Sequence, residues 1–322
     1  MHTNYFAYAS ADEAKAGIKE NSTNFMTLNG PWKFNWVRHA DARPTDFYQT
    51  NFNDKGWDDL QVPGVWELNG YGDPIYVNVG YAWRSQFKNN PPLVPTENNH
   101  VGSYRKEIIL PADWKGKEIF AHFGSVTSNM YLWVNGRQVG YHEDGMLPAE
   151  FNISGYLAEG ENSLAVQVFN WSDGSYLEDQ DFWRFSGIYR DVFLYALPKT
   201  HIRDFGIYPE LDDDLRDGSL KLNFSLRNVG AKRSDSKVRV TFKSPSGDRV
   251  FTAESDPVRA PAGGEANVGM VRRVAAPVKW SAEAPALYTA GIELLDVRGN
   301  VLQAMAQPVG FRRVEIREND KK

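Results

Sequence analysis

The feature that most constrains the fold of this chain is the alternation of apolar and polar residues in many short segments. Leu220, Leu222 and Phe224 give a clear example, because residues two apart along a strand point to the same face of a sheet. Turn residues separate these segments, and Asn135-Gly136 suits the positive φ angles of a type I′ hairpin turn. Many short strands joined by turns predict an all-β chain built from sandwiches.

The same alternation places further strands along the whole chain, including the hairpin of residues 130–141. The one convincing helix begins at Ser10, which can form a capping box with Glu13, and is expected to extend to Lys19. The other expected strands are Ser103–Leu110, Glu118–Phe123, Ser163–Asn170, Arg190–Ala196, Leu287–Leu295 and Val309–Ile316.

A change of composition near Pro198 indicates two domains. At 322 residues the chain exceeds the usual size of a single core. Trp and Tyr are frequent before Pro198 and scarce after it, so we predict one sandwich over residues 1–198 and another over residues 199–322. The second has the size of an immunoglobulin-like sandwich. It shows no cluster of acids, rings or histidines that suggests chemistry, and is interpreted as a spacer.

The overall charge and composition exclude several classes of partner. With 36 basic and 41 acidic side chains the net charge is −5, so a nucleic acid is not an expected partner. The chain has no Cys, which excludes disulfides, thiolate zinc sites and a thiol nucleophile. It has neither a signal-peptide pattern nor an apolar run of membrane-spanning length, so we expect a soluble chain without a membrane partner. The sequence leaves open whether the compartment is cytoplasmic or periplasmic.

Acidic and aromatic side chains are most concentrated between Trp171 and Asp191. Five carboxylates and six rings lie within these 21 residues, WSDGSYLEDQDFWRFSGIYRD. Aromatic faces suit the C–H faces of a sugar and carboxylates accept from its hydroxyls, so a carbohydrate is the first ligand to consider. The alternative is a surface loop whose rings anchor it to the body and whose acids stay solvated. The Pro-rich loop before Ser103 has the same two interpretations, as a ligand contact or as a cover over a sheet edge.

This cluster is not expected to hydrolyse a glycosidic bond by itself. Such hydrolysis normally needs two carboxyl groups on either side of the bond. Glu178, Asp179 and Asp181 are so close in sequence that they cannot bracket a bond from two sides. No other catalytic motif was found, and the six His residues are scattered singly.

Several longer segments resemble the glycoside hydrolase family 2 β-galactosidases of the lactose-operon type. The resemblance covers nearly the whole chain, and the WSDGSYLEDQD run followed by W-R-x-S-G-I is highly specific within that family. The segments that carry it are Leu28–Phe34, Val62–Glu67, Gly70–Val79, Pro91–Asn98, Trp171–Asp191, Trp280–Tyr288 and Val309–Arg312.

The resemblance implies a jelly-roll (galactose-binding-like) β-sandwich, then an immunoglobulin-like β-sandwich, then a catalytic (β/α)8 barrel. Because this chain stops at about the point where the family's chain enters the barrel, we expect a fragment of a retaining β-galactosidase that acts on terminal β-galactosides such as lactose. The fragment alone is expected to be inactive, with its own C-terminal barrel as its partner.

The resemblance also assigns four individual residues. By motif, Asn78 and Asp181 contact the galactosyl unit in the family, and Asp181 also ligates sodium. Asp173 and Glu143 match positions that help to hold a divalent ion such as magnesium, although the family commonly has Gln where Glu143 stands. Carboxylates are the hard oxygen ligands that both cations prefer. Sodium and magnesium are therefore expected for the full-length enzyme, and no cofactor is assigned to the fragment by itself.

Two other functions remain open on the residues alone. One is a stand-alone carbohydrate-binding module that uses the Trp-rich face. The other is an assembly module, in which the Pro-rich loop and exposed rings form the contacts of a homo-oligomer. Turn capping by Asn78 and a salt bridge from Asp181 to Arg184 or Arg190 are the structural alternatives for the two substrate-binding residues.

Overall fold

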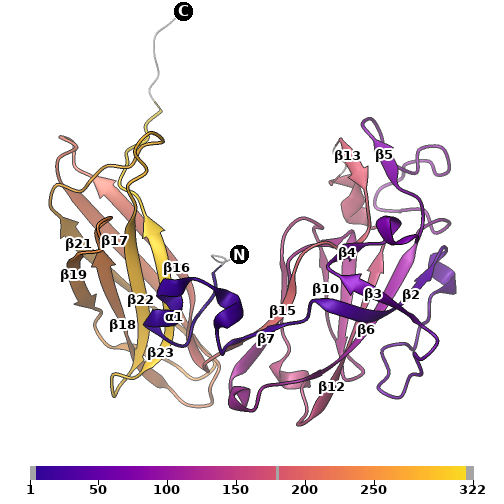
Figure 1. Ribbon diagram of the computed structural model, residues 1–322, viewed down its shortest axis with the longest axis horizontal. Helices are drawn as coiled ribbons and strands as arrows, with labels where there is room; N and C mark the ends of the chain where they lie inside the picture. Colours follow the sequence, from indigo (N-terminus) through magenta and orange to yellow (C-terminus); the bar gives the residue numbers. More distant parts are fainter. Residues whose placement is uncertain (1–4, 179–180, 317–322) are drawn as a thin grey trace, which may run out of the picture. The chain divides into compact units, whose positions relative to one another are not determined.

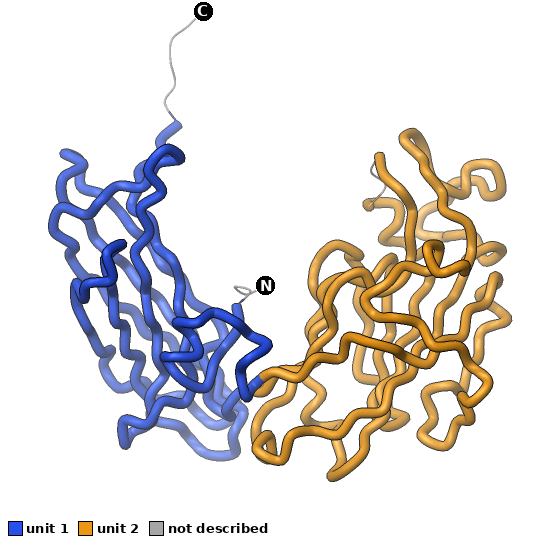
Figure 2. The backbone as a smooth tube through the Cα atoms, viewed as in Figure 1, with its two compact units in different colours: residues 1–24, 197–322 blue, residues 25–196 orange. Residues whose placement is uncertain are grey.

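The computed structural model describes residues 5–178 and 181–316. Strands make up most of the regular structure in this part of the chain, which confirms the all-β prediction (Figure 1). Contacts divide the chain into two compact units, coloured separately in Figure 2. One unit is Phe25–Ala196, and the other joins the residues from Leu197 onward to those before Phe25. No helix within the described ranges is long and apolar enough to cross a bilayer.

Residues 5–24 pack with the second unit, whereas the sequence-based division placed them in the first domain. Tyr8 pairs through its backbone with Ala304, with N–O distances of 2.9 Å in both directions. The rings of Tyr5 and Phe205 meet edge to face at 5.4 Å between centroids. This segment is polar overall, so only the neighbouring sheet reveals where its few rings are buried.

The helix α1 (Ala11–Ala16) begins as predicted and ends earlier. The Ser10 hydroxyl accepts from the backbone N–H of Glu13 at 3.2 Å, which is the expected N-cap. The helix stops at Gly17, whose φ of 69° is left-handed, so it does not reach Lys19. The remaining helical turns are short 3₁₀ segments: η1 (Lys19–Asn21), η2 (Ala40–Ala42), η3 (Glu67–Asn69), η4 (Ala112–Trp114), η5 (Ser154–Tyr156) and η6 (Asp173–Tyr176).

The Phe25–Ala196 unit is a sandwich of two antiparallel sheets. The smaller sheet has the order β1 (Phe25–Thr27), β15 (Val192–Leu197), β7 (Glu118–Phe123) and β11 (Ala149–Asn152). The larger has the order β10 (Arg137–Glu143), β9 (Asn129–Val134), β12 (Glu161–Phe169), β6 (Val101–Ile109), β2 (Gly30–Val37) and β3 (Asp58–Val62). Two small sheets complete the unit: β4 (Gly64–Val65), β14 (Gly187–Ile188) and β8 (Val126–Thr127) in one, and β5 (Ile75–Val77) with β13 (Phe182–Arg184) in the other.

Inward side chains of both main sheets form one core. Phe123 and Leu194 come from the smaller sheet and Leu132 and Val166 from the larger, and all four are essentially inaccessible to water. Such complete burial is the main stabilising term of a sandwich. The predicted hairpin joins β9 to β10, and Asn135 and Gly136 have φ angles of 50° and 76°, as a type I′ turn requires.

The second unit is also a sandwich, with a three-stranded sheet facing a five-stranded sheet. The first has the order β16 (Thr200–Leu211), β17 (Gly218–Asn228) and β21 (Glu265–Val274). The second contains β19 (Arg249–Glu254), β18 (Ser234–Lys243), β22 (Tyr288–Asp296) and β23 (Val301–Val309), and β20 (Val258–Ala260) pairs with β18. The core lies between the sheets, for example at Leu222, Phe242 and Ile292.

The expectation of a strand over Val309–Ile316 is wrong. Among the described residues the last strand is β23, which ends at Val309, and Phe311 forms only an isolated bridge with Lys279. β23 was not predicted because it buries a polar residue, Gln303. The side-chain oxygen of Gln303 accepts from the backbone N–H of Ile202 at 2.8 Å. A buried polar residue with a dedicated partner breaks the apolar alternation on which the prediction rested.

Candidate functional site

The antiparallel pair β5–β13 brings the two predicted substrate-binding residues together. Val77 pairs with Phe182 and Tyr76 with Trp183. Continuing this register by one residue places Asn78, which follows β5, opposite Asp181, which precedes β13. Both side chains are exposed. Residues more than 100 positions apart in the chain therefore meet at the end of one small sheet, visible as β5 and β13 in Figure 1.

Two half-exposed rings stand beside Asp181. The hydroxyl of Tyr76 donates to Asp181 Oδ1 at 2.5 Å, and this bond, followed by desolvation and the carboxylate charge, raises the pKa of Tyr76. Tyr76 and Trp183 are 53% and 51% exposed, with 5.6 Å between ring centroids. A carboxylate flanked by open aromatic faces can accept from sugar hydroxyls while a ring covers the C–H face.

The rings at the start of the acidic segment have a different environment. Trp171 packs edge to face against Trp83, with 5.4 Å between centroids, and Tyr176 does the same at 5.3 Å. The Tyr176 hydroxyl donates to the Leu93 carbonyl at 2.7 Å and accepts from the backbone N–H of Asn90 at 3.2 Å. For these rings the structure supports the anchoring interpretation, because they fasten the acidic segment to the Pro-rich loop.

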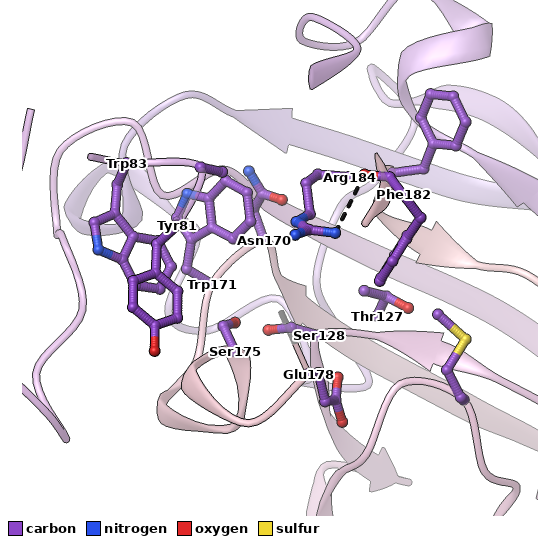
Figure 3. Close-up of a pocket in the computed structure, with 13 residues that line it drawn as sticks. Tyr81, Trp83, Thr127, Ser128, Asn170, Trp171, Ser175, Glu178, Phe182 and Arg184 are labelled. Atoms are coloured by element: carbon purple, nitrogen blue, oxygen red, sulfur yellow. Dashed lines mark hydrogen bonds between the residues drawn. The ribbon is translucent and has the colours of Figure 1, made fainter. Parts of the chain in front are cut away.

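A cavity lies beside the buried rings of Trp83 and Trp171 (Figure 3). Trp83, Trp171, Ser128 and Glu178 are among the side chains around it, together with Arg184. Its volume is about 30 Å³. Since one water molecule needs roughly 10–15 Å³ on this measure, the cavity has room for a few waters at most and none for a pyranose ring. A sugar would therefore contact the exposed rings outside and not this cavity.

The structure also brings the two residues of the predicted divalent site together. Glu143 ends β10, Asp173 opens η6, and a Glu143 carboxylate oxygen is 3.3 Å from where a Cβ on Gly174 would stand. Burial raises the pKa of Glu143, and the neighbouring Asp173 raises it further, while a hydrogen bond from Tyr141 opposes the shift. Two carboxylates held this close favour a cation between them. Within residues 5–178 and 181–316, however, no cluster of three or more potential ligands is present.

A further carboxylate, Glu67, was missed by sequence reasoning. Glu67 accepts from the backbone N–H of Ser186 at 3.0 Å, and burial raises its pKa to about 7 although the bonds from Ser186 oppose the shift. Ser186 follows the exposed ring segment, so Glu67 fastens the point where that segment returns to the core. A single Glu after a Trp gives no sign of this role, because burial is a tertiary property.

Two family models match the chain in succession. The sugar binding domain of glycosyl hydrolases family 2 matches residues 25–198, and a second glycosyl hydrolases family 2 model matches residues 200–312. The chain belongs to glycosyl hydrolase family 2. The Phe25–Ala196 unit, which carries β5 and β13, accordingly corresponds to the sugar binding domain of this family.

This family 2 chain is similar to curated β-galactosidases along almost its full length. It is 38% identical over 317 residues to the β-galactosidase of Priestia megaterium and 40% identical over 327 residues to that of Photobacterium profundum. Both alignments cover 98% of this chain, but 31% and 30% of the respective relative. The chain therefore spans about three tenths of the length of these relatives, as expected for the N-terminal portion of such a protein.

Solved structures agree on the fold. β-Glucuronidase 2 of Bacteroides uniformis superimposes with a TM-score of 0.74 at 23% identity, over 90% of this chain and 32% of that one. A β-glycosidase from Bacteroides vulgatus gives 0.67 at 25% identity, over 90% of this chain and 34% of that one. At this identity the likeness supports the two-sandwich architecture alone.

Sequence reasoning did not single out Tyr76 and Trp183 as members of the site. Tyr76 is two residues from Asn78, and residues two apart share a face of a strand, so its proximity could have been read from the spacing. Trp183 faces it only because β13 pairs with β5. Asp179 and Gln180, in the middle of the acidic segment, lie outside the described residues.

Proposed function

We propose that this chain is the sugar-binding and immunoglobulin-like portion of a retaining β-galactosidase whose catalytic carboxylates lie in a barrel outside the sequence given. The observation that carries the proposal is 38–40% identity to curated β-galactosidases over 98% of the chain. The described residues form two β-sandwiches, so a (β/α)8 barrel has to come from elsewhere. Terminal β-galactosides are the proposed substrates.

In this proposal the end of the β5–β13 sheet forms one wall of the galactosyl site. Asn78 offers an amide that can donate and accept, and Asp181 offers a carboxylate that accepts from sugar hydroxyls. Tyr76 holds one Asp181 oxygen and leaves the other carboxylate oxygen for a ligand. These groups bind and orient the sugar, and they have no proton-transfer role in bond cleavage.

The metal assignments belong to the same proposal. Sodium, when bound, would neutralise the Asp181 carboxylate next to the sugar, and the barrel would supply its other ligands. Magnesium would be held by Glu143 and Asp173; burial, and after it the neighbouring Asp173 carboxylate, raises the pKa of Glu143. Its role is structural, since it would tie η6 to β10.

The proposal is tested by comparing this chain with the complete coding region. The isolated 322-residue chain should release no aryl group from an aryl β-galactoside above a blank. The product of the complete open reading frame should hydrolyse this galactoside and should not hydrolyse a β-glucuronide with the same aryl group. Turnover by the isolated chain, or a reading frame that encodes no barrel, would contradict the proposal.

Within the full-length product, Asp181→Ala should lower kcat/KM by about 100-fold or more, because a charge-assisted contact to the sugar is lost. Trp57→Ala, in the same unit, whose ring packs against Phe47 and Phe52, provides a control for non-specific loss. Equal activity of Asp181→Ala and the parent protein would remove Asp181 from the substrate site.

A further inference from the structure

The outer face of the three-stranded sheet in the second unit has an unusual row of residues. Gly206 of β16 pairs with Asn223 of β17, which in turn pairs with Gly269 of β21. Side chains along a strand point alternately to its two faces. Phe205, Leu222 and Phe224 point into the core, so their neighbours Gly206 and Asn223 lie on the outer face. The two outer strands thus present no side chain of their own in this row, and the sheet is hollowed there.

The ring of Tyr208 lies over Gly206. A Cβ on Gly206 would stand 2.6–2.8 Å from the hydroxyl oxygen and two ring carbons of Tyr208, which no real Cβ tolerates. The backbone of Gly206 is not in the left-handed region, so glycine is needed here for the ring and not for a turn. Tyr208 remains 50% exposed. The sheet therefore carries a ring that is supported from beneath and open to solvent.

Polar groups surround this ring on one side. Two residues along each strand from the Gly206–Asn223–Gly269 row, Asp204 pairs with Ser225, and Ser225 pairs with Asn267. Asn223 pairs with Gly206, the residue that the ring covers. The carboxylate of Asp204 accepts from the backbone N–H of Phe205 at 2.9 Å, which restricts its orientation. The side-chain oxygen of Asn223 lies 3.0 Å from where a Cβ on Gly269 would stand, so the second glycine makes room for that amide.

The hollow formed by these residues has a volume of about 520 Å³. That is within the range of roughly 300–1,000 Å³ that holds small ligands, whereas the cavity beside Trp83 is far smaller. One aromatic platform with two amides, a hydroxyl and a carboxylate matches a neutral, hydroxyl-rich ligand that has one apolar face. Protein interfaces are typically depleted in Asp and Ser, so a protein partner fits this set of side chains less well.

We propose that the Tyr208 hollow is an accessory saccharide-binding site, in which a pyranose lies on the ring and hydrogen-bonds to Asn223, Asn267 and Asp204. The second sandwich would then be more than a spacer, because it would hold part of an oligosaccharide or retain the protein on a glycan. This site is independent of the proposed β-galactosidase activity and shares no residue with the β5–β13 site.

The experiment is a titration of the 322-residue chain with lactose and with a galacto-oligosaccharide, followed by NMR shifts and calorimetry. One ring face and a few hydrogen bonds predict a Kd on the order of 1 mM. Tyr208→Ala should weaken binding at least tenfold. Gly206→Ala should do the same, because the new methyl displaces the ring while the tyrosine is kept. Tyr208→Phe should retain most of the affinity.

Controls separate this proposal from the other site and from misfolding. The NMR shifts of the residues around Tyr208 report the hollow alone, and Trp183→Ala on the β5–β13 sheet should leave those shifts unchanged. Thermal unfolding should show that Gly206→Ala is folded. The proposal is overturned if no saccharide binding saturates, or if Gly206→Ala and Tyr208→Ala both bind as the parent chain does. It is equally overturned if binding disappears in Trp183→Ala alone, or if Tyr208→Ala changes only the oligomeric state in sedimentation.

Discussion

The two halves of the segment between Trp171 and Phe185 have similar composition and opposite environments. In the first half, Trp171 and Tyr176 are packed against Trp83 and hydrogen-bonded to the Pro-rich loop. In the second half, Trp183 is half exposed beside Tyr76 and Asp181. A high density of rings therefore does not by itself identify a binding surface. What distinguishes an anchor from a platform is whether another segment covers the ring.

The largest expected effect tests the anchored half. Trp83 is only 3% exposed and contacts both Trp171 and Tyr176. Trp83→Ala should lower the free energy of unfolding by about 3–5 kcal/mol, because it leaves a large cavity. Trp183→Ala, the matched change in the exposed half, should alter it by about 0.5 kcal/mol or less. Urea unfolding of the two variants measures both, and equal losses would abolish the distinction between the halves.

The next effect concerns the point where the exposed half returns to the core. Burial raises the pKa of Glu67 to about 7, above its ordinary value of 4.5. Glu67 therefore binds a proton more tightly in the folded chain than in the unfolded chain, so its contribution to stability is greatest below pH 4.5 and is lost as the pH rises through about 7. Between pH 5 and 8 this loss should amount to roughly 2–3 kcal/mol.

Glu67→Gln tests this assignment, because glutamine can still accept from Ser186 but does not titrate. Unfolding of the variant in urea at a series of pH values should show a much flatter dependence between pH 5 and 8 than the parent chain. If both chains lose the same stability over this range, Glu67 is not the group responsible.

A smaller effect is expected where the anchored half meets β10. If Glu143 and Asp173 hold magnesium with a Kd near 1 mM, 10 mM MgCl₂ should stabilise the chain by about 1.4 kcal/mol. For a unit of this size that corresponds to a rise in Tm of roughly 3–6 °C. The double variant Glu143→Gln, Asp173→Asn should lose this response. The site is refuted if magnesium does not change the Tm of the parent chain, or if it raises the Tm of the double variant by the same amount.

The smallest effect belongs to the exposed half. The hydrogen bond to Asp181 raises the pKa of Tyr76. Asp181→Asn should therefore shift the titration of this phenol to lower pH, with little change in stability because the pair is exposed. Ultraviolet difference titration against Tyr76→Phe isolates the signal of this one tyrosine. An unchanged titration would show that the two side chains do not interact in solution.

Much of the fold followed from local patterns, and the errors share one cause. The hairpin at Asn135-Gly136 and the N-cap at Ser10 were predictable because neighbouring residues form them. β23 was missed because it buries Gln303, and the placement of Tyr5 and Tyr8 with the second unit was missed because their partners are 197 and about 300 residues away. Local alternation cannot report a partner from a distant segment.

The family and the all-β class could be inferred from the sequence alone, because they depend on motifs and alternation that are contiguous in the chain. The same motifs predict Asn78, Asp181, Asp173 and Glu143 as site residues. The packing of strands and sheets sets which rings are open and which are buried. It adds Tyr76, Trp183 and Glu67 to the candidate site and forms the separate Tyr208 hollow. Exposure, a raised pKa and a hollow all depend on which atoms approach from elsewhere. That information arises only when strands pair and sheets pack.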